Sequence, residues 1–219
     1  MRLRFFIALL GCFCLSGCFK PGPNPLSSST IATFGLSDVS VDFAPNASIN
    51  YTQAEHDLAR THNVLPSDNT GTKRLIKTPQ GMAFIKAQAT TKLRAAFERA
   101  TRPVLRGSRP AQIHITITSI DIPGIARSFL TGGTSHLKAQ IVLIDANTGN
   151  PIVSLPEQAE FIFLRGGGLY GTALQEVLEA TGKVRPPFDR LAEKLAQDFA
   201  KWLSQGRMGP NQARARAPD

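Results

Sequence analysis

Apolar and polar residues alternate along four stretches of the chain, which is the pattern of strands that bury one face. These stretches cover residues 39–43, 113–122, 137–144 and 152–164. Between Ile117 and Ile120 the alternation changes phase, and a slip of one residue exchanges the two faces of a strand. We therefore expect a β-bulge near residues 118–119. Pro156 lacks the N–H that a central strand donates, so the fourth strand is expected to lie at an edge or to bulge there.

Two longer stretches repeat apolar residues every three or four positions, which predicts amphipathic helices. The first helix is expected to begin at Pro79, with Thr78 as its N-cap, and to end before Pro103. The second is expected to begin at Pro186 and to end at Gly206. Each helix presents one apolar stripe that can cover a sheet.

Shorter segments connect these elements. A capping-box sequence over residues 52–55 predicts a short helix up to about Thr61. Residues 66–72 are polar and are expected to form a loop, and Pro45 is expected to end the first strand. The turn-rich sequence 145–150 lies between two apolar runs and predicts an antiparallel hairpin.

The order of strand, helix, three antiparallel strands and helices indicates an α+β fold. We expect a two-layer sandwich, with helices packed on one face of a mostly antiparallel four-stranded sheet. Residues 34–204 are expected to form this single domain, since no internal repeat is present. Residues 205–219 are basic, lack periodicity and are expected to be a disordered tail.

The first 33 residues differ in character from the domain. Two arginines precede an apolar run over residues 5–15, and two small residues then precede Cys18. This is the layout of a secretory signal peptide, here residues 1–17. The run is shorter than the roughly 20 residues that span a bilayer. Residues 18–33 are rich in proline, glycine and serine and are expected to form a tether.

The sequence Leu15-Ser16-Gly17-Cys18 resembles the lipobox of bacterial lipoproteins. The resemblance implies that Cys18 is acylated and becomes the first residue of the mature protein. It also implies an outer-membrane anchor facing the periplasm, because Phe19 rather than aspartate follows the cysteine; inner-membrane anchoring stays open. With the hairpin sequence "IVLIDANTGNPI" and the glycine-rich exit into a closing helix, residues 34–204 resemble small envelope lipoproteins of uncharacterised-domain type, built as βαβββα sandwiches.

The positions of the cysteines and the net charge restrict which reactions and which partners the domain can have. All three cysteines lie at or before Cys18, so the domain has neither a disulfide nor a thiolate for catalysis or metal binding. The formal net charge is +9, to which the leader contributes two arginines. For an exported protein this charge favours anionic headgroups or an acidic partner over nucleic acid, although solubility alone also accounts for it.

No motif in the sequence predicts an enzyme. Residues 166–171 match the dinucleotide pattern G-x-G-x-x-G, but no βαβ unit follows, so no cofactor is expected. The nucleophile elbow G-x-S-x-G is absent. His114 and His136 could be neighbours across two strands, but no carboxylate pattern accompanies them and we expect no metal.

Two loops carry exposed apolar residues beside glycines and are expected to emerge at the same end of the sheet. Phe129 and Leu130 belong to the first loop and Tyr170 to the second. They are candidates for a partner contact, although Phe129 and Leu130 could equally fold back over the core. We expect a non-catalytic binding or assembly module with an envelope protein partner. The alternative is a lipid or small-solute carrier with a groove between helix and sheet.

Replacement of Cys18 by serine is predicted to abolish membrane retention without changing the fold, because it removes the only attachment point for lipid. Fractionation of the envelope after a high-salt wash measures retention. A variant that still sediments with membranes would contradict the lipobox assignment.

Overall fold

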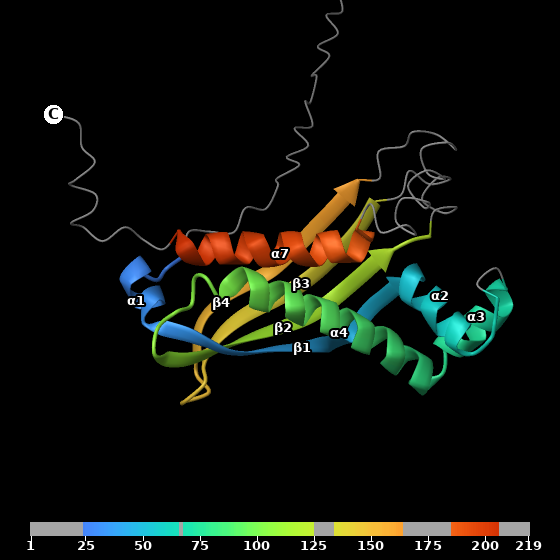
Figure 1. Cartoon of the computed structure of the whole chain (residues 1–219), viewed down its shortest axis with the longest axis horizontal. Coiled ribbons are helices and arrows are strands. Elements are labelled where there is room, and N and C mark those ends of the chain that lie inside the picture. The colour runs from blue at the N-terminus through green and yellow to red at the C-terminus, as the bar shows by residue number, and fades with distance from the viewer. Residues whose placement is uncertain (1–23, 66–67, 125–133, 164–184, 206–219) are drawn as a thin grey trace, which may run out of the picture.

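The computed structural model describes residues 24–65, 68–124, 134–163 and 185–205. They form two layers, in which helices α4 and α7 lie side by side on one face of a four-stranded sheet (Figure 1). The elements in chain order are α1 (Ser28–Ala32), β1 (Phe34–Tyr51), α2 (Thr52–Thr61), α3 (Asn69–Ile76), α4 (Pro79–Thr101), β2 (Arg109–Ile122), β3 (Thr134–Asp145), β4 (Pro151–Phe163) and α7 (Pro187–Ser204).

The sheet has the order β1-β2-β3-β4. Strands β1 and β2 are parallel, and the other two pairs are antiparallel. The parallel pair requires a crossover, which α4 provides. The expected α+β sandwich with a mostly antiparallel sheet is therefore confirmed.

The expected interruptions of the strands are also present. The register between β2 and β3 shifts between Ile117 and Ser119, which is the predicted bulge. β4 is an edge strand, and its pairing with β3 skips Pro156, between Leu155 and Gln158. Proline is tolerated here because the edge position leaves its missing N–H without a required partner.

Strand β1 is longer than expected, because Pro45 does not end it. The strand is interrupted between Phe43 and Ser48, and pairing with β2 then resumes and continues to Tyr51. Since β1 is also an edge strand, residues 44–47 can bulge without breaking an inner ladder. The interruption lies level with the bulge of β2, so both strands change phase together.

The expected loop over residues 66–72 is wrong, because a helix, α3, begins at Asn69. Asp68 caps it: the carboxylate accepts hydrogen bonds from the backbone N–H of Thr70 (3.1 Å) and Gly71 (2.9 Å). The capping carboxylate satisfies donors that the first turn leaves unpaired. By contrast, α4 begins as expected, with the Thr78 hydroxyl accepting from the N–H of Gly81 at 3.0 Å.

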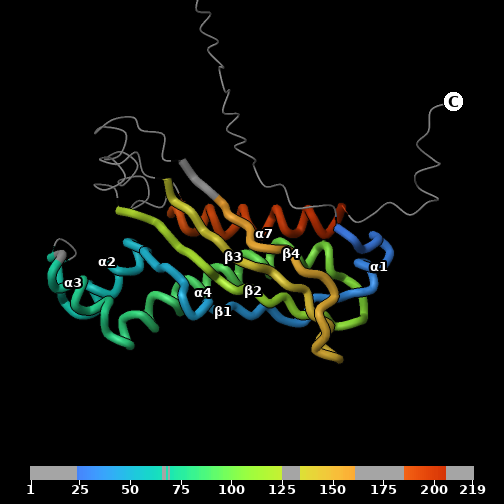
Figure 2. Tube along the Cα trace, turned by 180° about the vertical axis from the view of Figure 1, so that it is seen from behind, coloured from blue at the N-terminus to red at the C-terminus, as the bar shows by residue number. Residues whose placement is uncertain are grey.

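The core lies between the sheet and the two long helices. Phe97 of α4 and Phe199 of α7 meet there with ring centroids 5.8 Å apart. The isoleucine positions of β2 and the alternate positions of β3 are fully buried beneath them: Ile113, Ile115, Ile117, Leu137, Ala139, Ile141 and Leu143. Figure 2 shows the sheet from its other side, which no described helix crosses.

The N-terminal segment 24–33, assigned to the tether from sequence, instead packs on the domain. The Asn24 side chain is 1% exposed, and its amide donates to the carbonyl oxygens of Trp202 (3.4 Å) and Leu203 (3.1 Å). Ile31 of α1 is buried in the core. Proline and serine content predicted a tether, but a single buried amide and a few apolar residues are enough to hold this segment. Residues 18–23 lie outside the described part.

The hairpin turn between β3 and β4 is confirmed and centres on Asp145. This buried carboxylate accepts hydrogen bonds from the Nε of Arg109 at 3.0 Å and from the backbone N–H of Asn147 at 3.0 Å. Gly149 has a φ of +72°, a left-handed conformation that favours glycine. The hydrogen bonds from Arg109 and then Asn147 hold the pKa of Asp145 below its ordinary value.

We predict that this carboxylate stabilises the domain in a pH-dependent way. Because the folded pKa is depressed, the contribution is complete above the unfolded pKa of about 3.9 and is lost as the pH falls through the folded value. Unfolding in urea between pH 6 and 2 should show the difference in stability between the wild type and Asp145→Asn shrinking with acidification. A difference that stays constant over this range would contradict the assignment.

Candidate functional site

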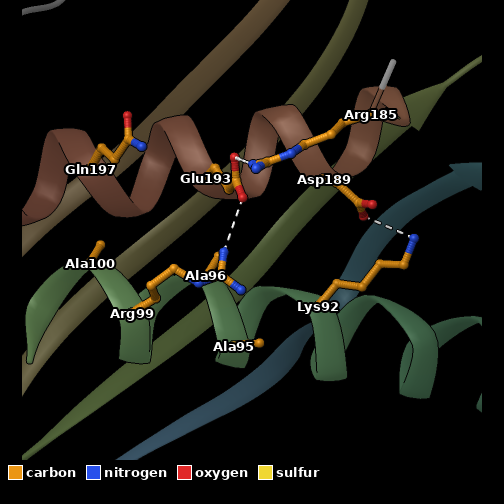
Figure 3. Close-up of a pocket in the computed structure, with 9 residues that line it drawn as sticks. All are labelled: Lys92, Ala95, Ala96, Arg99, Ala100, Arg185, Asp189, Glu193 and Gln197. Carbon is orange, nitrogen blue, oxygen red and sulfur yellow. Dashed lines mark hydrogen bonds and ion pairs between the residues drawn. The ribbon is translucent and has the colours of Figure 1, made fainter. Parts of the chain in front are cut away.

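A groove of about 700 Å³ runs between α4 and α7 on the outer side of the helix layer (Figure 3). Its residues come from the facing sides of the two helices and from Arg185, just before α7. Three of the lining residues are alanines, whose small side chains leave the space between the helices unfilled: Ala95, Ala96 and Ala100. The helices contact each other below this level through large side chains such as Phe97 and Phe199, so the small residues above them leave the groove open.

Charged side chains line the groove and pair across it. Lys92 of α4 lies 2.9 Å from a carboxylate oxygen of Asp189 in α7. Arg99 lies 3.0 Å from Glu193, which also pairs with Arg185. Glu193 therefore holds an arginine from each side of the groove (Figure 3). Because these side chains are partly exposed, each pair contributes at most about 1 kcal/mol to stability.

Tyr51 lies beneath one end of this row of charges. Its ring is 1% exposed and stacks on Phe188, with centroids 4.7 Å apart. Burial raises the pKa of its hydroxyl to about 12, against the opposing effect of the Lys92 ammonium. Burial acts to lower the pKa of Lys92, but the hydrogen bond to Asp189 and the interaction with Tyr51 outweigh it and raise the pKa. Lys92 is therefore charged across the physiological range.

The open face of the sheet carries two sets of hydroxyl, imidazole and carboxylate groups. Ser40 Oγ and His114 Nδ1 lie 3.0 Å apart, and His114 Nε2 lies 3.7 Å from Asp42. These distances are compatible with a nucleophile and its base. However, the set lies on the open face of the sheet, and its residues line neither of the two grooves that the structure shows between its elements.

The second set repeats this order on the same face. Ser119 Oγ lies 3.1 Å from His136 Nε2, and His136 Nδ1 lies 3.9 Å from Asp121. The expected proximity of His114 and His136 is wrong, because the register places His114 opposite Val142 and His136 opposite Asp121. Within the residues that the structure describes, no group of three or more histidine, cysteine or acidic side chains could hold a metal ion.

The candidate lipidation and partner-contact residues, and the glycine-rich sequence, lie outside the described part of the chain. This applies to Cys18, to the loop residues Phe129, Leu130 and Tyr170, and to the glycine-rich sequence 166–171. The residues that flank the two loops are described, and Thr134 pairs with Phe163. Both loops therefore leave the sheet at the same end, as expected, whereas the contact itself stays a prediction.

The groove was missed because its parts are unremarkable in the sequence. Lys92 and Arg99 appear as the polar face of a helix, and Asp189 and Glu193 as the polar face of another. One signal was present: three alanines, Ala95, Ala96 and Ala100, lie within six residues where α4 faces α7. Small residues on a polar helix flank indicate a gap only when the neighbouring helix is known.

No protein-family model and no curated protein matches the chain. Among solved structures, it is similar to a PelC dodecamer from Paraburkholderia phytofirmans, with 13% identity over 86% of this chain and 96% of that one and a TM-score of 0.32. It is also similar to a Xanthomonas campestris protein of the family DUF330, with 9% identity over 90% and 98% and a TM-score of 0.38.

A third similar structure is the lipoprotein GNA1162 from Neisseria meningitidis, with 13% identity over 70% of this chain and 99% of that one and a TM-score of 0.25. The similar structures thus include a lipoprotein and a DUF330 protein. The α+β fold is established by the strand order and helix packing of this chain. Among the described helices, none is both long enough and apolar enough to cross a membrane.

We predict that Tyr51 ionises only near pH 12, because its hydroxyl is buried. Tyr51 and Tyr170 are the only tyrosines, so absorbance titration of a Tyr170→Phe variant reports Tyr51 alone. Because the folded pKa lies above the ordinary 10.0, the stabilisation by the neutral hydroxyl is complete below pH 10 and is lost as the pH rises through about 12. A midpoint near 10 in the folded protein would contradict the burial of Tyr51.

Proposed function

We propose that this chain is a lipoprotein of the bacterial envelope whose domain is a non-catalytic binding or assembly module. Lipid on Cys18 would hold the domain at the outer membrane, facing the periplasm, and the groove between α4 and α7 would receive a segment of a partner protein. The lipobox resemblance of residues 15–18 supports the anchor. The chemistry of the groove supports the binding role.

The observation that carries the proposal is that opposite charges face one another across an open groove. Three cations and two carboxylates face one another there, at Lys92, Arg99, Arg185, Asp189 and Glu193. A partner segment with charges of both signs could exchange these exposed pairs for its own at little cost in free energy. Such exchange gives specificity and orientation more than affinity. The alanines leave room for the backbone of that segment.

A carrier of lipid or small solutes is supported less well. The interface between helices and sheet is filled, since Phe97, Phe199 and Ile141 are almost wholly buried there. A second groove of about 460 Å³ lies between α7 and β4, with Leu155 and Leu195 among its residues. Its volume would suit a small ligand, but Glu160 and Lys201 also line it. Native mass spectrometry of the gently extracted protein would reveal a bound lipid.

A bulky residue in the groove is predicted to prevent partner binding. Ala100→Phe would occupy the groove without changing its charges, because Ala100 lines it. A photo-crosslinking amino acid at exposed Gln197, which also lines the groove, reports the partner in intact cells. We expect the crosslinked adduct to be formed by the wild-type groove and to be strongly reduced by Ala100→Phe.

Ala87→Phe is the matched control, since Ala87 is exposed on the same helix and does not line the groove. It makes the same change in side chain and should leave the adduct unchanged. Equal adduct from both variants, with both folded by circular dichroism, would reject the groove as the binding site. The anchor would be unaffected by that result.

A further inference from the structure

The N-terminal end of the described chain is fixed to one end of the domain. Two hydrogen bonds from the buried Asn24 side chain join it to the last turn of α7, at Trp202 and Leu203. Asn24 follows Cys18 by six residues, which span at most about 22 Å when fully extended. A lipid on Cys18 would therefore keep this end of the domain close to the membrane surface.

The same end of the domain includes the connection between α4 and β2. The N–H of Gly107 donates to the carbonyl of Phe34 at 2.7 Å, and that of Arg109 donates to Thr33 at 3.0 Å. These bonds place the connection against the start of β1, directly after α1. In Figure 1, α1, this connection and the C-terminal end of α7 lie together at one end of the molecule.

Four exposed cations are presented there, and we call them the basic end: Arg102, Arg106, Arg109 and Lys201. Two of them form ion pairs: Arg109 with the buried Asp145, and Arg102 with Glu98 at 3.7 Å. In the part of the chain that the structure describes, Arg106 and Lys201 form no ion pair. The basic end thus keeps uncompensated positive charge beside the attachment point of the anchor.

The sequence on either side adds charge of the same sign. Lys20 lies between Cys18 and Asn24, and Arg207, Arg214 and Arg216 follow α7. Anionic headgroups attract lysine and arginine within roughly one Debye length, about 8–10 Å at physiological salt. A lipid anchor already provides the free energy that brings the protein to the surface. A few such cations are then enough to determine which side of the domain faces the bilayer.

We infer that the basic end contacts the anionic phospholipid headgroups of the membrane that holds Cys18. This contact rests on the proposed lipid anchor and adds an orientation to it. β2 has 14 residues and runs from Arg109 at the basic end to Ile122, about 45 Å away at the rise of a strand. The opposite end, where Thr134 and Phe163 flank the two loops, would then point away from the membrane.

The experiment uses the lipidated protein reconstituted into vesicles of phosphatidylcholine, with and without phosphatidylglycerol. The mature chain has no thiol besides Cys18, so a fluorophore can be placed on Ser108→Cys at the basic end or on Leu65→Cys at the opposite end. Both positions are exposed. A headgroup spin label on a fraction of the lipid quenches a fluorophore that lies near the surface.

We expect quenching at position 108 in vesicles with phosphatidylglycerol, and little quenching at position 65. The quenching should weaken in pure phosphatidylcholine and at high salt, since both remove the attraction between charges. Arg106→Glu combined with Lys201→Glu should abolish it. Lys73→Glu in α3 combined with Lys77→Glu at its C-cap makes the same change of charge at the other end of the domain and should have no effect.

The outcomes separate the orientation from the anchor. If the protein floats with vesicles but position 108 is quenched no more than position 65, the basic end is not a membrane contact and the anchor stands. If position 65 rather than position 108 is quenched, and the α3 variant abolishes that quenching, the domain is oriented by the cations at the α3 end, and the inference is wrong. If the wild type does not float with either vesicle, the lipid anchor itself is rejected, and the orientation with it.

Discussion

The packing of α4 and α7 side by side on one face of the sheet determines most of this structure. Phe97 and Phe199 meet between the helices and close the core. Above that contact the facing residues of α4 include three alanines, so the helices cannot fill the space between them. The charged groove is thus a consequence of how the core is packed. The end of α7 also offers the carbonyl groups that hold Asn24.

The two faces of the sheet must stay distinct along its whole length, and paired bulges achieve this. The alternation of β2 changes phase after Ile117, and without compensation Ile120 would face solvent. β1 is interrupted at the same level, between Phe43 and Ser48, so Tyr51 and Ile122 both end on the helix side. Two irregularities that appear independent in the sequence therefore have a single physical cause.

Elements whose apolar pattern is set by the core were predictable from the sequence. The strands, α4, α7, the bulge near residue 118 and the edge strand with Pro156 all follow from local rules. Elements that depend on a distant partner were not. The continuation of β1 beyond Pro45 requires an edge position, and the packing of Asn24 requires the end of α7. The predicted proximity of His114 and His136 was wrong because the register between β2 and β3 depends on the bulge in β2 and on the path of the chain between the strands.

The position of the groove along α7 limits which partners could use it. Gln197, at one end of the groove, lies six residues before Leu203, or about 9 Å at the rise of a helix, and Arg185 lies about 18 Å further on. If Cys18 holds the C-terminal end of α7 within about 22 Å of a bilayer, the whole groove lies within roughly 50 Å of that surface. Under the proposed function, a partner would have to bring its binding segment into this layer, either from the same membrane or from a structure that approaches it.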